Sequence, residues 1–111
     1  MTDFTKQHCV PCEGGIAPLT KADAEETMKH VPEWVLDGEG KSITQQFVFK
    51  DFVEAMVFVN KVADLAEAEG HHPDIFVSWN KVVLTLSTHA IGGLSTNDFI
   101  VAVKVDGINT N

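Results

Sequence analysis

Three of the five histidines in this 111-residue chain fall within nineteen positions, and the chemistry they offer is proton transfer. His71 and His72 are adjacent, and His89 follows at the end of a run of strand-forming residues. An imidazole gives or takes a proton near neutral pH, so a cluster of them suits a reaction with one proton in and one out. No serine or cysteine stands beside them in a nucleophile motif, and no known phosphate-binding glycine loop is present.

The histidine pattern leaves two other interpretations open. Histidines at the end of a helix are often solvated residues without a catalytic role. Glu67 and His71 are four residues apart and would share a helix face, so with His89 they could form the two-histidine, one-carboxylate set of non-haem iron sites. Cys9 and Cys12 are one half of a zinc motif whose second half is absent from the sequence. The sequence therefore favours a site without a metal.

The segment before the histidines is the clearest predicted helix. Residues 51–69 carry apolar side chains at helical spacing, and a capping pair of acidic residues opens the segment. Gly70 suits the left-handed conformation in which helices often end. Pro73 pushes His72 into an extended backbone conformation. Two imidazoles should therefore be held at a helix-to-strand junction.

A hairpin should bring the third histidine to the same place. Residues 75–79 and 82–87 predict two strands around a turn at Asn80-Lys81, in which Trp79 would face Val82. In an antiparallel hairpin the start of the first strand neighbours the end of the second. The three histidines are therefore expected to converge at one end of a sheet.

The other elements complete an α+β fold. A helix is expected from residue 20 until a proline at 32 ends it, followed by strands over 34–36 and 42–49. Ser95 and Asp98 form a capping pair at the start of a last helix, which should run from Thr96 to about Asp106, although residues 99–103 would also suit a strand. The predicted order is α-β-β-α-β-β-α, a four-stranded antiparallel sheet with helices packed on one face.

Composition sets the class of protein. Residues 1–18 have no periodicity and are interpreted as an N-terminal arm, and residues 19–111 as a single domain.

The net charge of -8 disfavours nucleic acid and anionic membrane surfaces as partners. Because the chain shows no signal peptide and no apolar run of ~20 residues, we expect a cytoplasmic protein. The strand over 42–49 has no proline and lysines only at its ends, so we expect unprotected sheet edges to pair in a homo-oligomer.

The same residues resemble the signature of the pterin-4a-carbinolamine dehydratase family. The resemblance covers nearly the whole chain, and its spacing extends over some thirty residues. The matching positions are Glu67, His71-His72-Pro73, Trp79-Asn80-Lys81-Val82, Leu84 to His89, Asp98, Pro32-Glu33-Trp34 and, in the arm of the bacterial form, Cys9 to Gly15.

The resemblance implies an activity and a set of roles. The family dehydrates the 4a-hydroxytetrahydropterin that aromatic amino acid hydroxylases release, needs no metal or cofactor, and forms dimers or tetramers. By similarity, His71 and His89 would transfer protons and His72 would mainly bind the pterin. Asp98 would orient a histidine or hold the substrate. The remaining substrate-binding residues would be Glu67 and two tryptophans that wall the pocket, Trp34 and Trp79.

A second function is compatible with the same fold. Some members of the family act as dimerisation cofactors, so the chain could be a non-catalytic assembly module that stabilises a partner protein. Such a module would be expected to lose its histidine site. Here the histidines are complete, which favours the enzyme.

Overall fold

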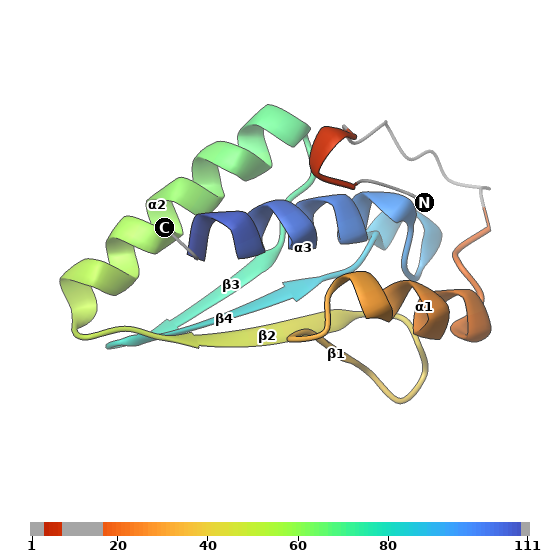
Figure 1. Cartoon of the computed structure of the whole chain (residues 1–111), viewed down its shortest axis with the longest axis horizontal. Helices are drawn as coiled ribbons and strands as arrows, with labels where there is room; N and C mark the ends of the chain where they lie inside the picture. Colours follow the sequence, from red (N-terminus) through yellow and green to blue (C-terminus); the bar gives the residue numbers. More distant parts are fainter. Residues whose placement is uncertain (1–3, 8–16, 110–111) are drawn as a thin grey trace.

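The protein is a four-stranded antiparallel sheet with its helices on one face, as Figure 1 shows. The computed structural model describes residues 4–7 and 17–109, so Cys9 and Cys12 lie outside the described residues. The predicted α+β class and element order are confirmed. In chain order the elements are η1 (Phe4–Lys6), α1 (Lys21–Thr27), η2 (Met28–His30), β1 (Val35–Leu36), β2 (Ile43–Val48), α2 (Phe52–Glu69), β3 (Asp74–Ser78), β4 (Lys81–Leu86), η3 (His89–Ile91) and α3 (Thr96–Asn109).

The strands lie in the order β1-β2-β4-β3. The expectation that residues 42–49 form an unprotected edge is wrong, because β2 pairs with β1 on one side and with β4 on the other. A central place suits β2, whose inward-facing Ile43 and Phe47 are buried. The edges are instead β1, which is two residues long, and β3.

The hairpin of β3 and β4 turns one residue earlier than predicted, at Trp79-Asn80. Two hydrogen bonds hold Asn80 to the chain after β2: its Nδ2 donates to the Phe49 carbonyl (2.9 Å), and its carbonyl accepts from the Phe49 N–H (2.8 Å). Trp79 then has a φ of 50°, in the left-handed region. The predicted pairing of Trp79 with Val82 is therefore wrong. Moving the turn by one residue changes each partner by two, so the inward face is unchanged: Ile75 pairs with Leu84 and Val77 with Val82.

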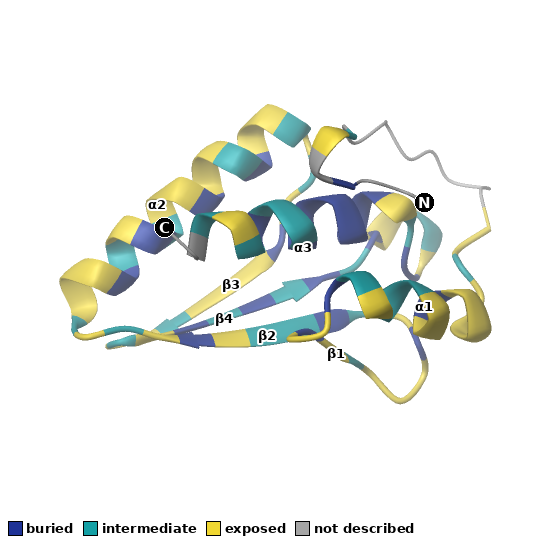
Figure 2. Ribbon diagram, viewed as in Figure 1, coloured by how far each residue is buried: buried dark blue, intermediate teal, exposed yellow. Residues whose placement is uncertain are grey.

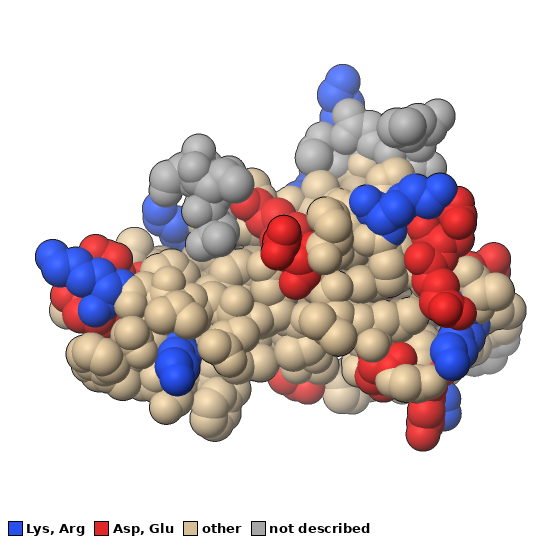
Figure 3. All heavy atoms as spheres, turned by 60° about the horizontal axis from the view of Figure 1, so that its bottom comes forward, with Lys and Arg blue, Asp and Glu red and all other residues tan. Residues whose placement is uncertain are grey.

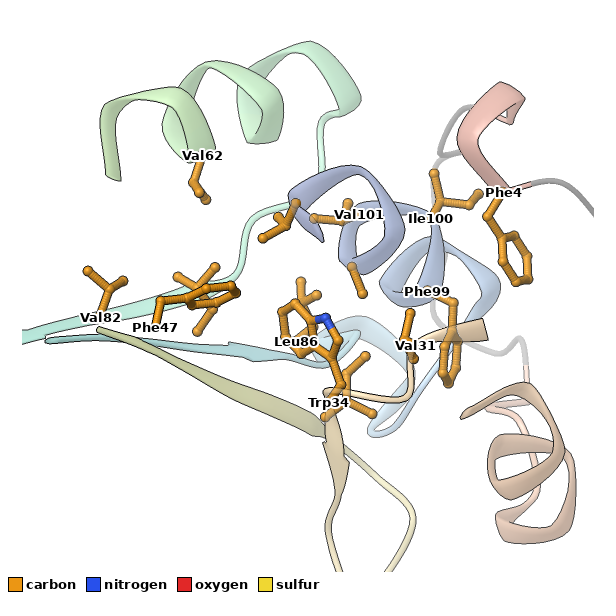
Figure 4. Packing of buried hydrophobic residues seen from close by; sticks show 14 of the residues in the cluster. Phe4, Val31, Trp34, Phe47, Val62, Val82, Leu86, Phe99, Ile100 and Val101 are labelled. Carbon is orange, nitrogen blue, oxygen red and sulfur yellow. The ribbon is translucent and has the colours of Figure 1, made fainter. Parts of the chain in front are cut away.

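The core lies between the sheet and the helices (Figures 2 and 4). The segment over residues 99–103 is helical, so the strand alternative is wrong, and α3 continues to Asn109. Its β-branched residues accept a helix because tertiary burial outweighs their weak local preference. Phe4 is buried in the same core and meets the His30 ring edge-on, with centroids 5.0 Å apart. The largest apolar side chains that are almost wholly buried are those of Phe99, Ile43, Leu84, Leu86, Leu94, Val31, Val62, Val82, Val101 and Val105.

No helix within residues 4–7 and 17–109 is long and apolar enough to cross a bilayer. Uncharged side chains make up much of the side turned forward in Figure 3, with acidic side chains near its centre and both acidic and basic ones toward its ends. The cytoplasmic location stays a prediction.

Trp34 anchors the first strand to the last helix. Its side chain is buried, and its ring meets Phe47 edge-on at 6.3 Å. The indole Nε1–H donates to Asp106 of α3 (3.0 Å), which also accepts from Gln45 Nε2 (2.9 Å). Burial raises the pKa of the Asp106 carboxyl above its ordinary value of 3.8, and the two donors only partly oppose this rise.

Replacing this carboxyl should change how stability depends on pH. Because the pKa of Asp106 is higher in the folded chain, its contribution to stability is fully present at low pH and is lost as pH rises through that pKa. Asp106→Asn keeps an oxygen acceptor but no charge. The melting temperature of the variant relative to wild type should therefore increase as the pH is raised above the ordinary carboxyl pKa of 3.8, as measured by circular dichroism.

Asp37→Asn supplies a control of opposite sign. The Lys41 N–H holds the pKa of Asp37 below its usual range, so this group favours folding above that pKa and loses its effect as pH falls. The Asn variant should lose melting temperature relative to wild type as pH rises. Parallel curves for wild type and Asp106→Asn would refute the assignment.

Candidate active site

The junction after α2 fixes the first histidine. Gly70 ends the helix at φ 66°, and the N–H of His71 then bonds to the Ala66 carbonyl (3.2 Å). Lys104 of α3 and Glu69 form an ion pair at 2.7 Å in which both side chains are largely buried. The end of α2 is thereby held against α3, and His71 starts from a constrained backbone.

A buried carboxylate receives the His71 ring. The Asp98 side chain is fully buried, and its Oδ1 lies 2.6 Å from His71 Nε2. Its Oδ2 accepts from the Thr88 hydroxyl (2.8 Å) and from the Ser95 N–H (3.0 Å). The two hydroxyl oxygens of Thr88 and Ser95 are 2.8 Å apart. The predicted helix cap of Ser95 by Asp98 is present, and the same carboxylate also binds a histidine.

These contacts assign the tautomer of His71. When the Asp98 carboxylate is ionised it can only accept hydrogen bonds, and Nε2 of His71 then carries the proton shared between the two groups. The Nδ1 atom is then the ring nitrogen left to accept a proton from a substrate. A carboxylate plays the same part for the histidine of a serine protease, where it fixes the ring and its tautomer.

The second histidine has a different environment. His72 Nε2 lies 2.5 Å from Glu67 Oε2, with side chains 57% and 78% exposed. Glu67 thus pairs with His72. The iron-site alternative would instead need Glu67 to lie with His71 and His89. No three His, Cys, Asp or Glu side chains of the described residues are grouped so as to hold a metal ion.

The third histidine lies beside the same network. His89 begins η3 and is exposed, directly after Thr88. The N–H of Thr88 donates to the Gly93 carbonyl (2.8 Å), which closes the loop that carries His89. Because the Thr88 hydroxyl bonds to Asp98, one carboxylate connects His71 to the residue next to His89.

The two tryptophans lie elsewhere. Trp79 is 64% exposed at the far end of β3, about 16 Å along the strand from the histidine junction. Trp34 is buried against Asp106. Their predicted part in walling a pterin pocket stays a prediction. The sequence reasoning missed Thr88, although its place beside His89 was an available signal.

Comparison with known proteins gives a consistent family. The family model described as pterin 4 alpha carbinolamine dehydratase matches residues 17–108. A protein of Halorhodospira halophila is 46% identical over 105 residues, covering 95% of this chain and 96% of its own. One of Methylococcus capsulatus is 48% identical over 103 residues, covering 93% of this chain and 90% of its own. Both carry the provisional name pterin-4-alpha-carbinolamine dehydratase.

Two solved structures share the fold. A transcriptional coactivator/pterin dehydratase from Brucella melitensis has a TM-score of 0.77 and 34% identity, covering 82% of this chain and 97% of its own. A pterin dehydratase-like RuBisCO assembly factor of the alpha-carboxysome has a TM-score of 0.60 and 24% identity, covering 71% and 92%, which bears on the fold alone. On the family model and the relatives together, this chain belongs to the pterin 4 alpha carbinolamine dehydratase family.

Proposed function

We propose that the protein dehydrates a 4a-hydroxytetrahydropterin to a quinonoid dihydropterin and water, in the recycling of the pterin used by an aromatic amino acid hydroxylase. The observation that carries this proposal is the bond from His71 to the buried Asp98 beside the His89 loop. Family membership supports the same reaction. An assembly module would have no use for a histidine oriented in this way.

The reaction needs one acid and one base. The C4a–O bond breaks, the proton on N5 leaves, and a C4a–N5 double bond forms. Hydroxide is a poor leaving group, so an acid must protonate its oxygen, while a base takes the N5 proton. We assign the base to Nδ1 of His71, because Asp98 stabilises the imidazolium that forms. His89, exposed beside Thr88, supplies the acid.

The other predicted residues would bind or position. The exposed pair of His72 and Glu67 suits contact with the polar edge of a pterin, because both side chains are open to solvent. Asp98 is too deeply buried to reach substrate, so its proposed part is to position His71. No metal or other cofactor enters this mechanism.

Removing either proton-transfer group should stop most of the catalysis. His71→Ala and His89→Ala should each lower the dehydration rate at least ~10²-fold, the range expected for positioned acid–base groups. His72→Ala should mainly raise KM. The assay follows freshly generated 4a-hydroxytetrahydropterin by stopped-flow absorbance.

His30→Ala is the matched control, because His30 lies on η2 against Phe4 and has no part in the site. It should keep the wild-type rate. Near-normal rates in both the His71 and His89 variants would rule out the mechanism.

Metal removal should leave the enzyme active. The arrangement of Glu67 with His72, and of His71 with Asp98, leaves these side chains engaged with each other. We expect no stoichiometric metal by elemental analysis and an unchanged rate after dialysis against chelator. One zinc per chain that is lost in Cys12→Ser would contradict this expectation.

We also propose that the protein forms a homo-oligomer through the free edge of β3. The edge strand carries exposed Ile75 and Phe76, and Trp79 follows it. Two such edges can pair across a two-fold axis and satisfy each other's backbone groups. Antiparallel pairing would set the end of one β3 beside the start of the other. Trp79 of each chain would then approach the histidine end of its partner.

Light scattering at micromolar concentration should give at least a dimer. Phe76→Asp places a charge in the proposed interface and should yield monomers. Val53→Asp is the control, since Val53 is equally exposed but lies on α2, and it should remain at least dimeric. The same samples should not retard DNA at low salt, given the net charge of -8. A monomeric wild type, or retarded DNA, would overturn these expectations.

A further inference from the structure

We propose that Thr88 is a positioning residue for proton transfer by His71, an inference that rests on the proposed dehydration. Thr88 follows the end of β4 and is 4% exposed. Its hydroxyl lies 2.8 Å from Asp98 Oδ2, on the side of the carboxylate away from His71. It is therefore one step removed from the histidine ring.

The protons of this network have one consistent arrangement. The Thr88 hydroxyl has a single proton, which goes to Asp98 because an ionised carboxylate only accepts. The Ser95 hydroxyl, 2.8 Å away, must then donate to Thr88. With the Ser95 N–H, two donors converge on Oδ2 and leave Oδ1 to His71.

This arrangement determines how the carboxylate faces the ring. Without the Thr88 hydroxyl, the Ser95 N–H would be the one remaining donor to Oδ2 among the described residues, and the plane of the buried carboxylate would be less firmly held. His71 would then sample both tautomers, and in one of them Nδ1 carries the proton and cannot act as a base. The backbone of Thr88 is fixed by its pairing with Gly93, so its hydroxyl is well placed to impose this constraint.

The test compares three substitutions. Thr88→Val keeps the shape of the side chain but removes the hydroxyl, and should lower kcat roughly ten-fold with little change in KM, the order expected for one hydrogen bond to a charged group. Thr88→Ser restores the hydroxyl and should recover most of the rate. Thr85→Val is the control, because the Thr85 hydroxyl of β4 pairs with the Thr44 hydroxyl of the neighbouring strand β2 and not with Asp98. The kcat of this variant should match that of wild type.

A spectroscopic measurement separates positioning from folding. The ¹⁵N shifts of the His71 ring should show the proton on Nε2 in wild type and a mixture of tautomers in Thr88→Val. Should Thr88→Val fold poorly, Ser95→Ala removes the donor to Thr88 and should give a smaller change in the same direction. A lower melting temperature with wild-type kcat and tautomer would refute the inference, because Thr88 would then be only structural.

The two proposals fail in different ways. If wild type does not dehydrate the pterin, the proposed function fails, yet the tautomer of His71 in Thr88→Val still decides whether Thr88 positions the ring. If wild type is active and Thr88→Val is equally active with an unchanged tautomer, the inference alone is refuted.

Discussion

Everything at the candidate site depends on how one buried carboxylate is satisfied. A charge without solvent is costly unless hydrogen bonds replace the lost water, and Asp98 is fully buried. Its donors come from three places along the chain: His71 after α2, Thr88 after β4 and Ser95 before α3. The ends of these three elements are thereby fixed relative to one another. The His71 ring and the loop that carries His89 are therefore held in a fixed arrangement by the fold itself.

The two adjacent histidines illustrate what burial does to an ion pair. His71 and Asp98 are 12% and 0% exposed, so their bond is poorly screened and holds the ring in one orientation. His72 and Glu67 are mostly exposed, and such pairs contribute little because water and salt compete with them. Neighbouring residues of the same type therefore suit different tasks. A fixed ring serves proton transfer, which needs a defined geometry, whereas an exposed pair can exchange its partner for a ligand.

Local signals in the sequence were enough for the elements but not for their partners. Gly70 ends α2 in the left-handed conformation that the sequence predicted, because that preference belongs to the residue itself. The spacing of Asp98 from Ser95 likewise predicted a helix cap. Its second partner, His71, could not be read in this way, because that contact depends on where the end of α2 meets α3. The turn after β3 was misplaced for the same reason: Asn80 is held by a residue of a different hairpin.

The last helix shows why such polar contacts are retained in an apolar core. Hydrophobic burial has no direction, so a helix as apolar as α3 could pack in more than one rotation or register at similar free energy. Three charged groups along it remove this freedom. Asp98 meets the histidine, Lys104 meets Glu69 of α2, and Asp106 meets Trp34 before β1. Each contact carries a desolvation cost that an apolar pair would avoid. We infer that this cost is offset by specificity: α3 can satisfy all three groups in only one position, and in that position Asp98 faces His71.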